Sequence, residues 1–182
     1  MILTNRTSKT AIQISMWKLA ILLGCFVFVL DVITKYLTQE YLPLNYLNPH
    51  FYPYGGIGVF KNFLGIEFSI NHATNRGAAW GILAEFQSSL LILRIILVSA
   101  MLVYVLFYNK DVSKQIPLML IMSGAIGNIC DYFFYGHVID MFHFIFWRYD
   151  YPIFNVADSA IFIGIVWLFL LSTLKPKEKP SI

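Results

Sequence analysis

The sequence predicts an α-helical, polytopic membrane protein, and three observations lead to this fold class. Of its 182 residues, 58% are hydrophobic and only 13% are Asp, Glu, Lys or Arg, against about 25% charged residues in ordinary globular domains. The mean hydropathy of +0.67 means more apolar surface than a core of this size can bury. Four segments are long and apolar enough to be transmembrane helices. This composition argues against a soluble, nucleic-acid-binding or disordered protein.

The four apolar segments each approach the roughly 20 residues that a helix needs to cross about 30 Å of hydrocarbon. They cover about residues 19–37, 90–108, 116–134 and 154–174. The first follows basic residues, as the core of a signal peptide does. It has no small-residue cleavage site and continues directly into Asp31, which predicts a retained helix. We therefore expect a single membrane domain over residues 1–182.

Basic residues predict the orientation of these helices. Eight of them lie before the first segment, between the second and third, or after the fourth: Arg6, Lys9, Lys18, Lys110, Lys114, Lys175, Lys177 and Lys179. Only Lys61, Arg76 and Arg148 lie in the two other connections. Because loops rich in Lys and Arg stay in the cytoplasm, both termini are expected there. The connections at about residues 38–89 and 135–153 are then extracytoplasmic.

The two outer connections carry patterns of their own. Residues Ile66 to Ile70 alternate between apolar and polar side chains with a period of two, which predicts a small sheet. The second connection is rich in aromatic residues, which we expect to lie in the headgroup belt of the membrane. These are Phe142, Phe144, Phe146, Trp147, Tyr149 and Tyr151.

Polar residues gather where the helices reach the outer side. Charged side chains inside a span are costly, so their placement carries information. The groups are Asp31 with Lys35, Asn75 with Arg76 and Gly77, Asn128 with Asp131, and Asn155 with Asp158. Since all of them belong to the same side of the membrane, we expect one polar site near the outer interface. Arg94, about one turn inside the second span, is expected to extend toward the interface or to pair with an acid.

Several of these groups also allow a purely structural interpretation. Asp31 and Lys35 are spaced i, i+4 with the acid first, which favours a helical ion pair. Asn155 and Asp158 suit the N-terminus of a helix, where they would cap amide groups. Asp140 lies in the second outer connection, where an isolated acid is usually solvated.

One helical stripe in the third segment combines small and polar residues. Gly124, Gly127, Asn128 and Asp131 fall at i, i+3, i+4 and i+7, and so share one face of the helix. The glycines could simply permit close helix packing. Packing does not require the amide or the carboxylate, which therefore suggest a functional site.

Several carboxylates near a lipid interface indicate acid–base chemistry. Two carboxylates at close range can share a proton, so that one is a base and the other an acid. The base then activates a water and the acid protonates the leaving group, as in an aspartic protease. If Lys35 engages Asp31, then Asp131, Asp140 and Asp158 remain as candidates, and the residues alone do not choose among them.

We expect neither a metal nor another cofactor. The four histidines lack the spacing of zinc ligands, and the two cysteines form no C-x-x-C pair. The motifs of serine hydrolases and of phosphate-binding loops are absent from the sequence.

Five runs resemble, in order and spacing, the motifs of the bacterial lipoprotein signal peptidase family, also called signal peptidase II. They are Asp31-Val-Ile-Thr-Lys35, Asn75-Arg-Gly-Ala-Ala79, Gly124-Ala-Ile-Gly-Asn128-Ile-Cys-Asp131, Val138-Ile-Asp140 and Phe154-Asn-Val-Ala-Asp158-Ser159. The resemblance implies an aspartic endopeptidase of the bacterial inner membrane. Such an enzyme removes the signal peptide from prolipoproteins, just before a cysteine that carries a diacylglyceryl group. Its partners are then this substrate and membrane lipid, with no nucleic acid, and a monomer is expected.

The resemblance also implies residue roles. Asp140 and Asp158 are expected to form the catalytic dyad. The residues expected to support the dyad or hold the substrate are Asp31, Lys35, Asn75, Gly77, Gly124, Asn128, Asp131, Asn155 and Ala157. The outer connections are expected to form a small β-cradle and an interfacial helix over the substrate.

The chain departs from the family pattern at a few positions. An Arg usually follows the acid that matches Asp131, but this chain has Tyr132. Arg76 and Arg148 are the candidates to replace that arginine. Met141 stands where Phe is usual, and Trp80 is bulkier than many residues after Gly-Ala-Ala. These changes concern the shape of the pocket more than the reaction.

Two other classes of function compete with a peptidase. A small proton-coupled transporter or a lipid-binding membrane protein would also need acids within the membrane, but distributed through its depth. A purely structural subunit is the third interpretation. The collection of polar residues at one face favours the peptidase over both.

Overall fold

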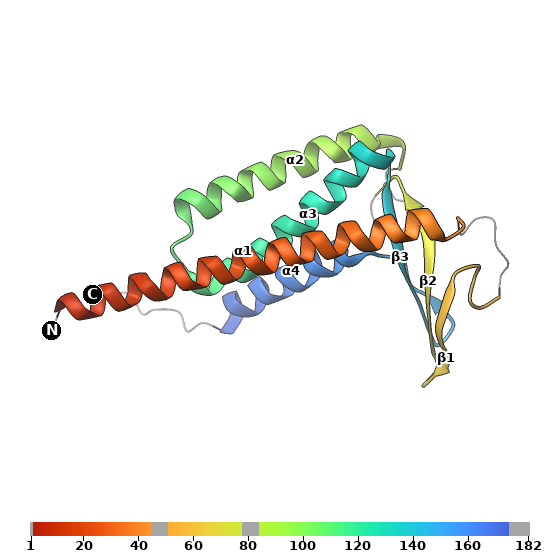
Figure 1. The fold of residues 1–182 in the computed structure, drawn as a ribbon, viewed down its shortest axis with the longest axis horizontal. Helices are drawn as coiled ribbons and strands as arrows, with labels where there is room; N and C mark the ends of the chain where they lie inside the picture. The colour runs from red at the N-terminus through yellow and green to blue at the C-terminus, as the bar shows by residue number, and fades with distance from the viewer. Residues whose placement is uncertain (1, 45–50, 78–83, 175–182) are drawn as a thin grey trace.

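The computed structural model describes residues 2–44, 51–77 and 84–174, with the side chains of residues 13–44, 51–77 and 85–174. Its four long helices are α1 (Ile2–Tyr41), α2 (Gln87–Val103), α3 (Gln115–Tyr135) and α4 (Val156–Leu174) (Figure 1). The stretches long and apolar enough to cross a membrane are Gln13–Tyr41, Gln87–Tyr108, Val112–Tyr135 and Val156–Leu174. The four predicted transmembrane helices are therefore confirmed.

The first helix is much longer than the apolar segment that predicts it. Helix α1 has 40 residues, which at about 1.5 Å per residue is twice the thickness of the hydrocarbon. Hydropathy marks only the part of a helix that lies in lipid, whereas backbone hydrogen bonding continues into the polar flanks. Helix α2 continues at its C-terminal end into a π-helical turn, η4 (Tyr104–Tyr108).

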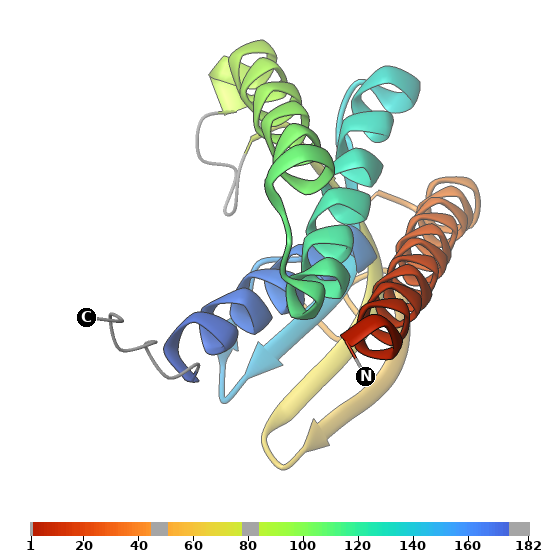
Figure 2. The same ribbon diagram turned by 90° about the vertical axis from the view of Figure 1, so that its left-hand side faces the viewer.

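A four-stranded antiparallel sheet lies across one end of the helices. Its strands are β1 (Ile57–Phe63), β2 (Ile66–Asn75), β3 (Val138–Phe146) and β4 (Tyr149–Asp150), in the order β1-β2-β3-β4. Figure 2 views the helices from the end opposite the sheet, with the strands crossing behind them. The alternation at Ile66 to Ile70 correctly predicts β2. Beyond α1, the described part of residues 42–86 has no helix other than the 3₁₀ turn η3 (Ala84–Phe86), so the expected interfacial helix is not located there.

Two connections bring the acids of different elements together. Gly136 ends α3 in the left-handed conformation, with φ of 75°, which glycine adopts without strain. Strand β3 begins two residues later, so the N–H of Ile139 in β3 reaches Oδ2 of Asp131 in α3 at 3.2 Å. Phe154 pairs with β3, because its N–H donates to Phe142 O at 3.2 Å and its carbonyl accepts from Phe142 N at 2.8 Å. Helix α4 therefore begins beside β3.

The helices expose large apolar side chains to their surroundings. Phe26 of α1, Phe107 of η4 and Phe169 of α4 are 62%, 73% and 64% exposed. In water such surfaces would be costly, whereas in lipid they are the normal exterior of a helix bundle. The exposed fractions agree with a protein whose solvent is the bilayer.

Candidate active site

A buried lysine, Lys35 of α1, lies at the centre of the polar residues. Its Nζ is 2.7 Å from Oδ2 of Asp31 and 2.8 Å from Oδ2 of Asp131. It also donates a hydrogen bond of 2.9 Å to Oδ1 of Asn128. An ammonium group has three N–H donors, so each can be used within the protein. The predicted Asp31–Lys35 ion pair is present, and Asp131 shares the same ammonium group.

The two acids beside Lys35 also accept hydrogen bonds from backbone N–H groups. Oδ1 of Asp31 accepts from the N–H of Ala157 at 2.8 Å, in the first turn of α4. Oδ2 of Asp131 accepts from the N–H of Ile139 at 3.2 Å, in β3. These contacts join α1, α3, α4 and β3 at one point.

Asp131 is thereby separated from the other two candidate acids. Among the ion pairs between described residues, neither Asp140 nor Asp158 has a cationic partner. The three acids that the residue pattern left open therefore divide into one that is bound to a cation and two that are not. Within the described residues, no three His, Cys, Asp or Glu side chains are arranged to hold a metal ion.

Asn155 contacts both of these two acids. Its Oδ1 accepts a hydrogen bond of 2.8 Å from the N–H of Asp158, so it caps α4. Its Nδ2 donates to Oδ1 of Asp140 at 2.7 Å and lies 3.2 Å from Oδ1 of Asn128. The structural interpretation of Asn155 as a helix cap is correct, and the same side chain also belongs to the polar site.

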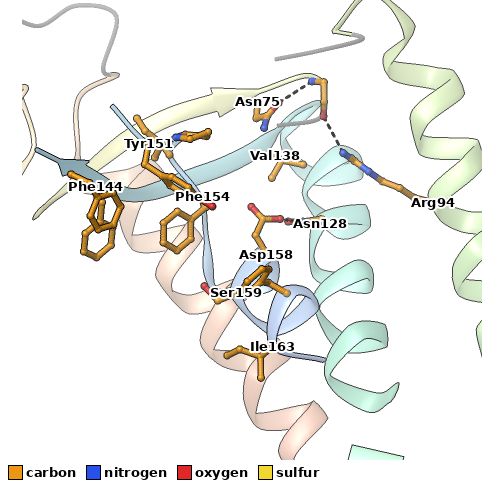
Figure 3. Close-up of a pocket in the computed structure, with 15 residues that line it drawn as sticks. Asn75, Arg94, Asn128, Val138, Phe144, Tyr151, Phe154, Asp158, Ser159 and Ile163 are labelled. Atoms are coloured by element: carbon orange, nitrogen blue, oxygen red, sulfur yellow. Dashed lines mark hydrogen bonds between the residues drawn. The ribbon is translucent and has the colours of Figure 1, made fainter. Parts of the chain in front are cut away.

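Asn128 holds the carboxylate of Asp158, as Asn155 holds that of Asp140. Its Nδ2 donates a hydrogen bond of 2.8 Å to Oδ1 of Asp158, as Figure 3 shows. Its Oδ1 faces the donors of Lys35 and Asn155, which fixes the orientation of its amide. Each of the two acids is therefore held by an amide group, and the two amides contact one another.

Asp140 is almost completely buried, with 2% of its surface exposed. Its Oδ2 accepts a hydrogen bond of 3.1 Å from Nδ2 of Asn75. Asp140 pairs with Ala73 in the sheet, so Asn75 is its diagonal neighbour on the same face. Burial and the negative charge of Asp158 raise the pKa of Asp140 to about 7, against the opposite effect of the amide donors. The interpretation of Asp140 as a solvated loop acid is wrong.

Two glycines of α3 make room for the site. A Cβ on Gly124 would collide with the carbonyl oxygen of Ala157, and one on Gly127 would lie 2.5 Å from Oδ2 of Asp31. The glycine stripe permits close packing of α3, as one interpretation of the sequence held. That packing is also what admits the Asp31 carboxylate between the helices.

Arg94 of α2 contributes a contact that sequence reasoning missed. Its Nη2 donates a hydrogen bond of 3.0 Å to the carbonyl oxygen of Gly77, and the N–H of Gly77 donates to Oδ1 of Asn75 at 2.9 Å. The expected pairing of Arg94 with an acid is not among the interactions of the described residues. The last two residues of the Asn75–Ala79 motif lie outside the described ranges, as does Trp80.

An apolar cavity of about 690 Å³ opens beside Asp158 (Figure 3). Asn75, Gly77, Arg94 and Asn128 also line it. Its apolar lining includes Phe144, Phe146, Tyr151, Phe154, Phe162 and Ile163. The Asp158 carboxylate and its amide partner therefore face a volume that suits an apolar ligand.

Three of the aromatic residues expected in the headgroup belt, Phe144, Phe146 and Tyr151, line this cavity. Phe144 and Phe154 stack with ring centroids 5.9 Å apart and an interplanar angle of 14°. Period-two alternation along β3 places Phe144 and Phe146 on the same face as Asp140. That alternation is the signal in the sequence that could have identified them.

The two arginines expected to replace the family arginine at the position of Tyr132 lie outside the cavity. Neither Arg76 nor Arg148 lines the cavity, whereas Arg94 does. Arg76 is exposed, and Arg148 lines a separate hollow on the sheet, next to Trp147. Neither of the two predicted substitutes is therefore a residue of the cavity wall.

Comparison with known proteins adds an independent observation. Residues 23–174 match the family described as signal peptidase (SPase) II. A lipoprotein signal peptidase of Clostridium acetobutylicum is 37% identical over 125 residues, which is 68% of this chain and 79% of that protein. One from Chlamydia pneumoniae is 37% identical over 118 residues, or 62% of this chain and 70% of that protein.

Two solved structures have a similar fold. Both are described as a bacterial membrane enzyme structure by the in meso method. One is 29% identical with a TM-score of 0.73, and covers 91% of this chain and 95% of its own. The other is 28% identical with a TM-score of 0.68, and covers 88% and 95%. With a family match over most of its length and four membrane-spanning helices, this chain belongs to the signal peptidase II family.

Proposed function

We propose that the chain is an intramembrane aspartic endopeptidase that removes the signal peptide from prolipoproteins, before a diacylglyceryl-modified cysteine. The relatives are named lipoprotein signal peptidases, which supports this substrate class. The observation that carries the reaction type is the pair Asp140 and Asp158, each held by an amide group, with Asp158 lining an apolar cavity and Asp140 buried behind it in β3.

In this proposal Asp140 is the acid and Asp158 is the base. The raised pKa of Asp140, about 7, keeps its proton available near neutral pH. Asp158 faces the cavity and takes a proton from a water as that water attacks the scissile carbonyl carbon. The proton of Asp140 then passes to the leaving amine. The amides of Asn128 and Asn155 hold the two carboxyl groups in position.

The cavity supports a substrate that is apolar at two places. A signal peptide is apolar, and so are the acyl chains of a diacylglyceryl group. The Phe and Ile side chains beside Asp158 can contact both. In the proposed orientation, both termini are cytoplasmic and the sheet lies at the outer face, because eight basic residues flank the other ends of the spans. The enzyme would work as a monomer, without a cofactor.

A proton-coupled transporter is the competing function. Such a protein needs polar groups through the depth of the membrane. The described contacts of Lys35, Asn128 and Asn155 instead gather at the sheet end of the bundle. Proton-coupled uptake by the chain in liposomes, without cleavage of a prolipoprotein, would favour the transporter.

The decisive experiment is a cleavage assay with the purified protein in detergent and a diacylglyceryl-modified prolipoprotein. Asp140→Asn and Asp158→Asn should each lower kcat by about 10²-fold to 10⁴-fold, the usual contribution of a general acid or base. Glu40→Gln is the matched control, since Glu40 is an exposed acid near the C-terminal end of α1, the end that carries Lys35. It should cleave like the parent. Substantial cleavage by either Asp variant would remove the proposed dyad.

A further inference from the structure

A charged side chain within the second span has a specific contact that the proposed reaction does not yet use. Arg94 lies about two turns inside α2, where an arginine is costly unless it has a partner. Its guanidinium lines the cavity and donates to the carbonyl oxygen of Gly77 at 3.0 Å. Gly77 itself is buried. The arginine is therefore directed at the backbone of the site.

The bond from Arg94 to Gly77 is the first of three consecutive hydrogen bonds that lead to Asp140. The N–H of Gly77 donates to Oδ1 of Asn75 at 2.9 Å, and Nδ2 of Asn75 donates to Oδ2 of Asp140 at 3.1 Å. Figure 3 draws the bond from Arg94 to Gly77 and the bond from Gly77 to Asn75, between α2 and the end of β2. Because Gly77 occupies the amide oxygen of Asn75, the amide nitrogen is the group that faces Asp140.

The end of β2 needs such a contact. The ladder between β2 and β3 ends with the pair Asn75 and Val138, so Gly77 lies beyond the last strand pair. Among the hydrogen bonds between described residues, Arg94 is the partner of the Gly77 carbonyl. Holding that carbonyl also fixes the direction of the Gly77 N–H, and with it the amide of Asn75.

We propose that Arg94 is a positioning residue of the peptidase reaction: through Gly77 it holds Asn75 with its amide nitrogen toward Asp140. The inference rests on the proposed function, because it assigns Arg94 to the acid of that reaction. Arg94 itself does not touch the reacting groups in this account. It acts through the orientation of the asparagine.

This arrangement makes a prediction about pH that a general structural role does not make. A hydrogen bond from Asn75 stabilises the ionised carboxylate of Asp140, so losing it raises the pKa of Asp140. The charged groups that act on Asp140 are Asp158 of α4 and Lys35 of α1, and both stay in place when Arg94 is changed. The alkaline limb of the pH–rate profile should therefore move to higher pH.

The test compares Arg94→Met with the parent in the prolipoprotein assay, across a range of pH. We expect kcat to fall about tenfold, within the range for a misplaced catalytic group. The alkaline limb should move up by roughly 0.5 to 1 pH unit, as expected for one weakened hydrogen bond to a carboxylate. KM should change little. Arg94→Lys, which keeps a charged donor, should recover part of both effects.

A double-variant cycle separates positioning from stability. If Arg94 acts through Asn75, then Arg94→Met should have almost no further effect on kcat or on the pH limb in an Asn75→Ala background. Gln87→Ala is the matched control, since Gln87 of α2 donates a hydrogen bond of 2.6 Å to Gly136 O and takes no part in the hydrogen bonds between Arg94, Gly77 and Asn75. It should leave the alkaline limb where it is in the parent.

The outcomes distinguish this inference from the function on which it rests. If the parent cleaves and Arg94→Met keeps the parent's pH profile, or raises KM alone, the positioning role is wrong and the peptidase remains. Multiplicative losses in the Asn75→Ala background would also overturn it. If the parent does not cleave, the proposed function itself fails. Should Arg94→Met not yield folded protein, Arg94→Leu, which also lacks a donor for the Gly77 carbonyl, carries the same expectations.

Discussion

Nδ2 of Asn155 donates a hydrogen bond of 2.7 Å to Oδ1 of Asp140, which joins the N-terminus of helix α4 to strand β3. Oδ1 of the same side chain accepts from the N–H of Asp158. The side chain of Asn155 therefore holds the carboxylate of Asp140 and the backbone N–H of Asp158. Asn155 is a direct link between the two acids, beside the separate contacts of Asn75 with Asp140 and of Asn128 with Asp158.

Asn155→Ala should reduce both stability and activity. Loss of the helix cap costs about 0.5 to 2 kcal/mol, and loss of the donor to Asp140 misplaces the acid. We expect kcat to fall by about 10²-fold and the melting temperature in detergent to drop. Asn155→Ser separates the two effects, because a serine hydroxyl can still cap α4 but is too short to replace the amide donor to Asp140. It should melt closer to the parent and lose about as much kcat as Asn155→Ala; recovery of cleavage would contradict this account.

Lys35→Met should be the most destabilising single change in the site. Lys35 is 1% exposed and lies within 2.8 Å of the carboxylates of Asp31 and Asp131. Removing the ammonium leaves two acids buried without a cation, a loss of about 3 to 5 kcal/mol for a broken buried ion pair. Thermal unfolding in detergent measures this, with the exposed Lys110→Met as the control. A melting temperature equal to that of the control would show that the ion pairs are dispensable.

The pH dependence of cleavage should be bell-shaped, with an alkaline limb near neutral pH. Burial and the charge of Asp158 raise the pKa of Asp140 to about 7. If protonated Asp140 is the acid, activity is retained below that value and is lost as the pH rises through it. The profile of kcat/KM should show this limb in the presence of a chelator as well. An activity that stays constant from pH 6 to pH 9 would exclude Asp140 as the acid.

The helix packing makes a prediction about two glycines. A Cβ on Gly127 would lie 2.5 Å from Oδ2 of Asp31, whereas one on Gly24 would lie 3.4 Å from Cε of Met119. Gly127→Ala should therefore displace the buried carboxylate and destabilise the protein by about 1 to 3 kcal/mol. Gly24→Ala should be neutral or slightly stabilising, because alanine favours a helix. Equal melting temperatures of the two variants would contradict this difference.

The sequence predicts the polar residues of the site well, because a polar residue in an apolar span is costly and therefore conspicuous. Asp31, Lys35 and Asn128 could be selected on that ground, and the direction of each helix predicts that they meet. The local i, i+4 spacing accounts for Asp31 with Lys35. It gives no sign that Asp131 shares the ammonium group, because that contact depends on how α1 packs against α3.

The apolar part of the site and Arg94 could not be predicted in the same way. Phe144 looks like any other aromatic residue of the outer connection, and its place in the cavity depends on the register of β3 with β2 and on its stacking with Phe154. The bond from Arg94 to Gly77 joins α2 to the segment after β2 through a backbone carbonyl. A backbone carbonyl has no signature in the amino-acid sequence.

Two phenylalanines of α4 test whether the cavity holds the apolar part of the substrate. Phe162 and Phe169 lie seven residues apart on one face of the helix and are 68% and 64% exposed, but only Phe162 lines the cavity. Burying an aromatic side chain against a ligand contributes about 1.5 to 3 kcal/mol, so Phe162→Ala should raise KM by about ten-fold to a hundred-fold. The value of kcat should hardly change, because this contact is the same in the ground state and the transition state. Phe169→Ala removes an equal side chain that does not line the cavity, and it should leave KM unchanged. If both variants raise KM equally, the effect comes from the helix surface in general, and the cavity is not where the acyl chains or the signal peptide bind.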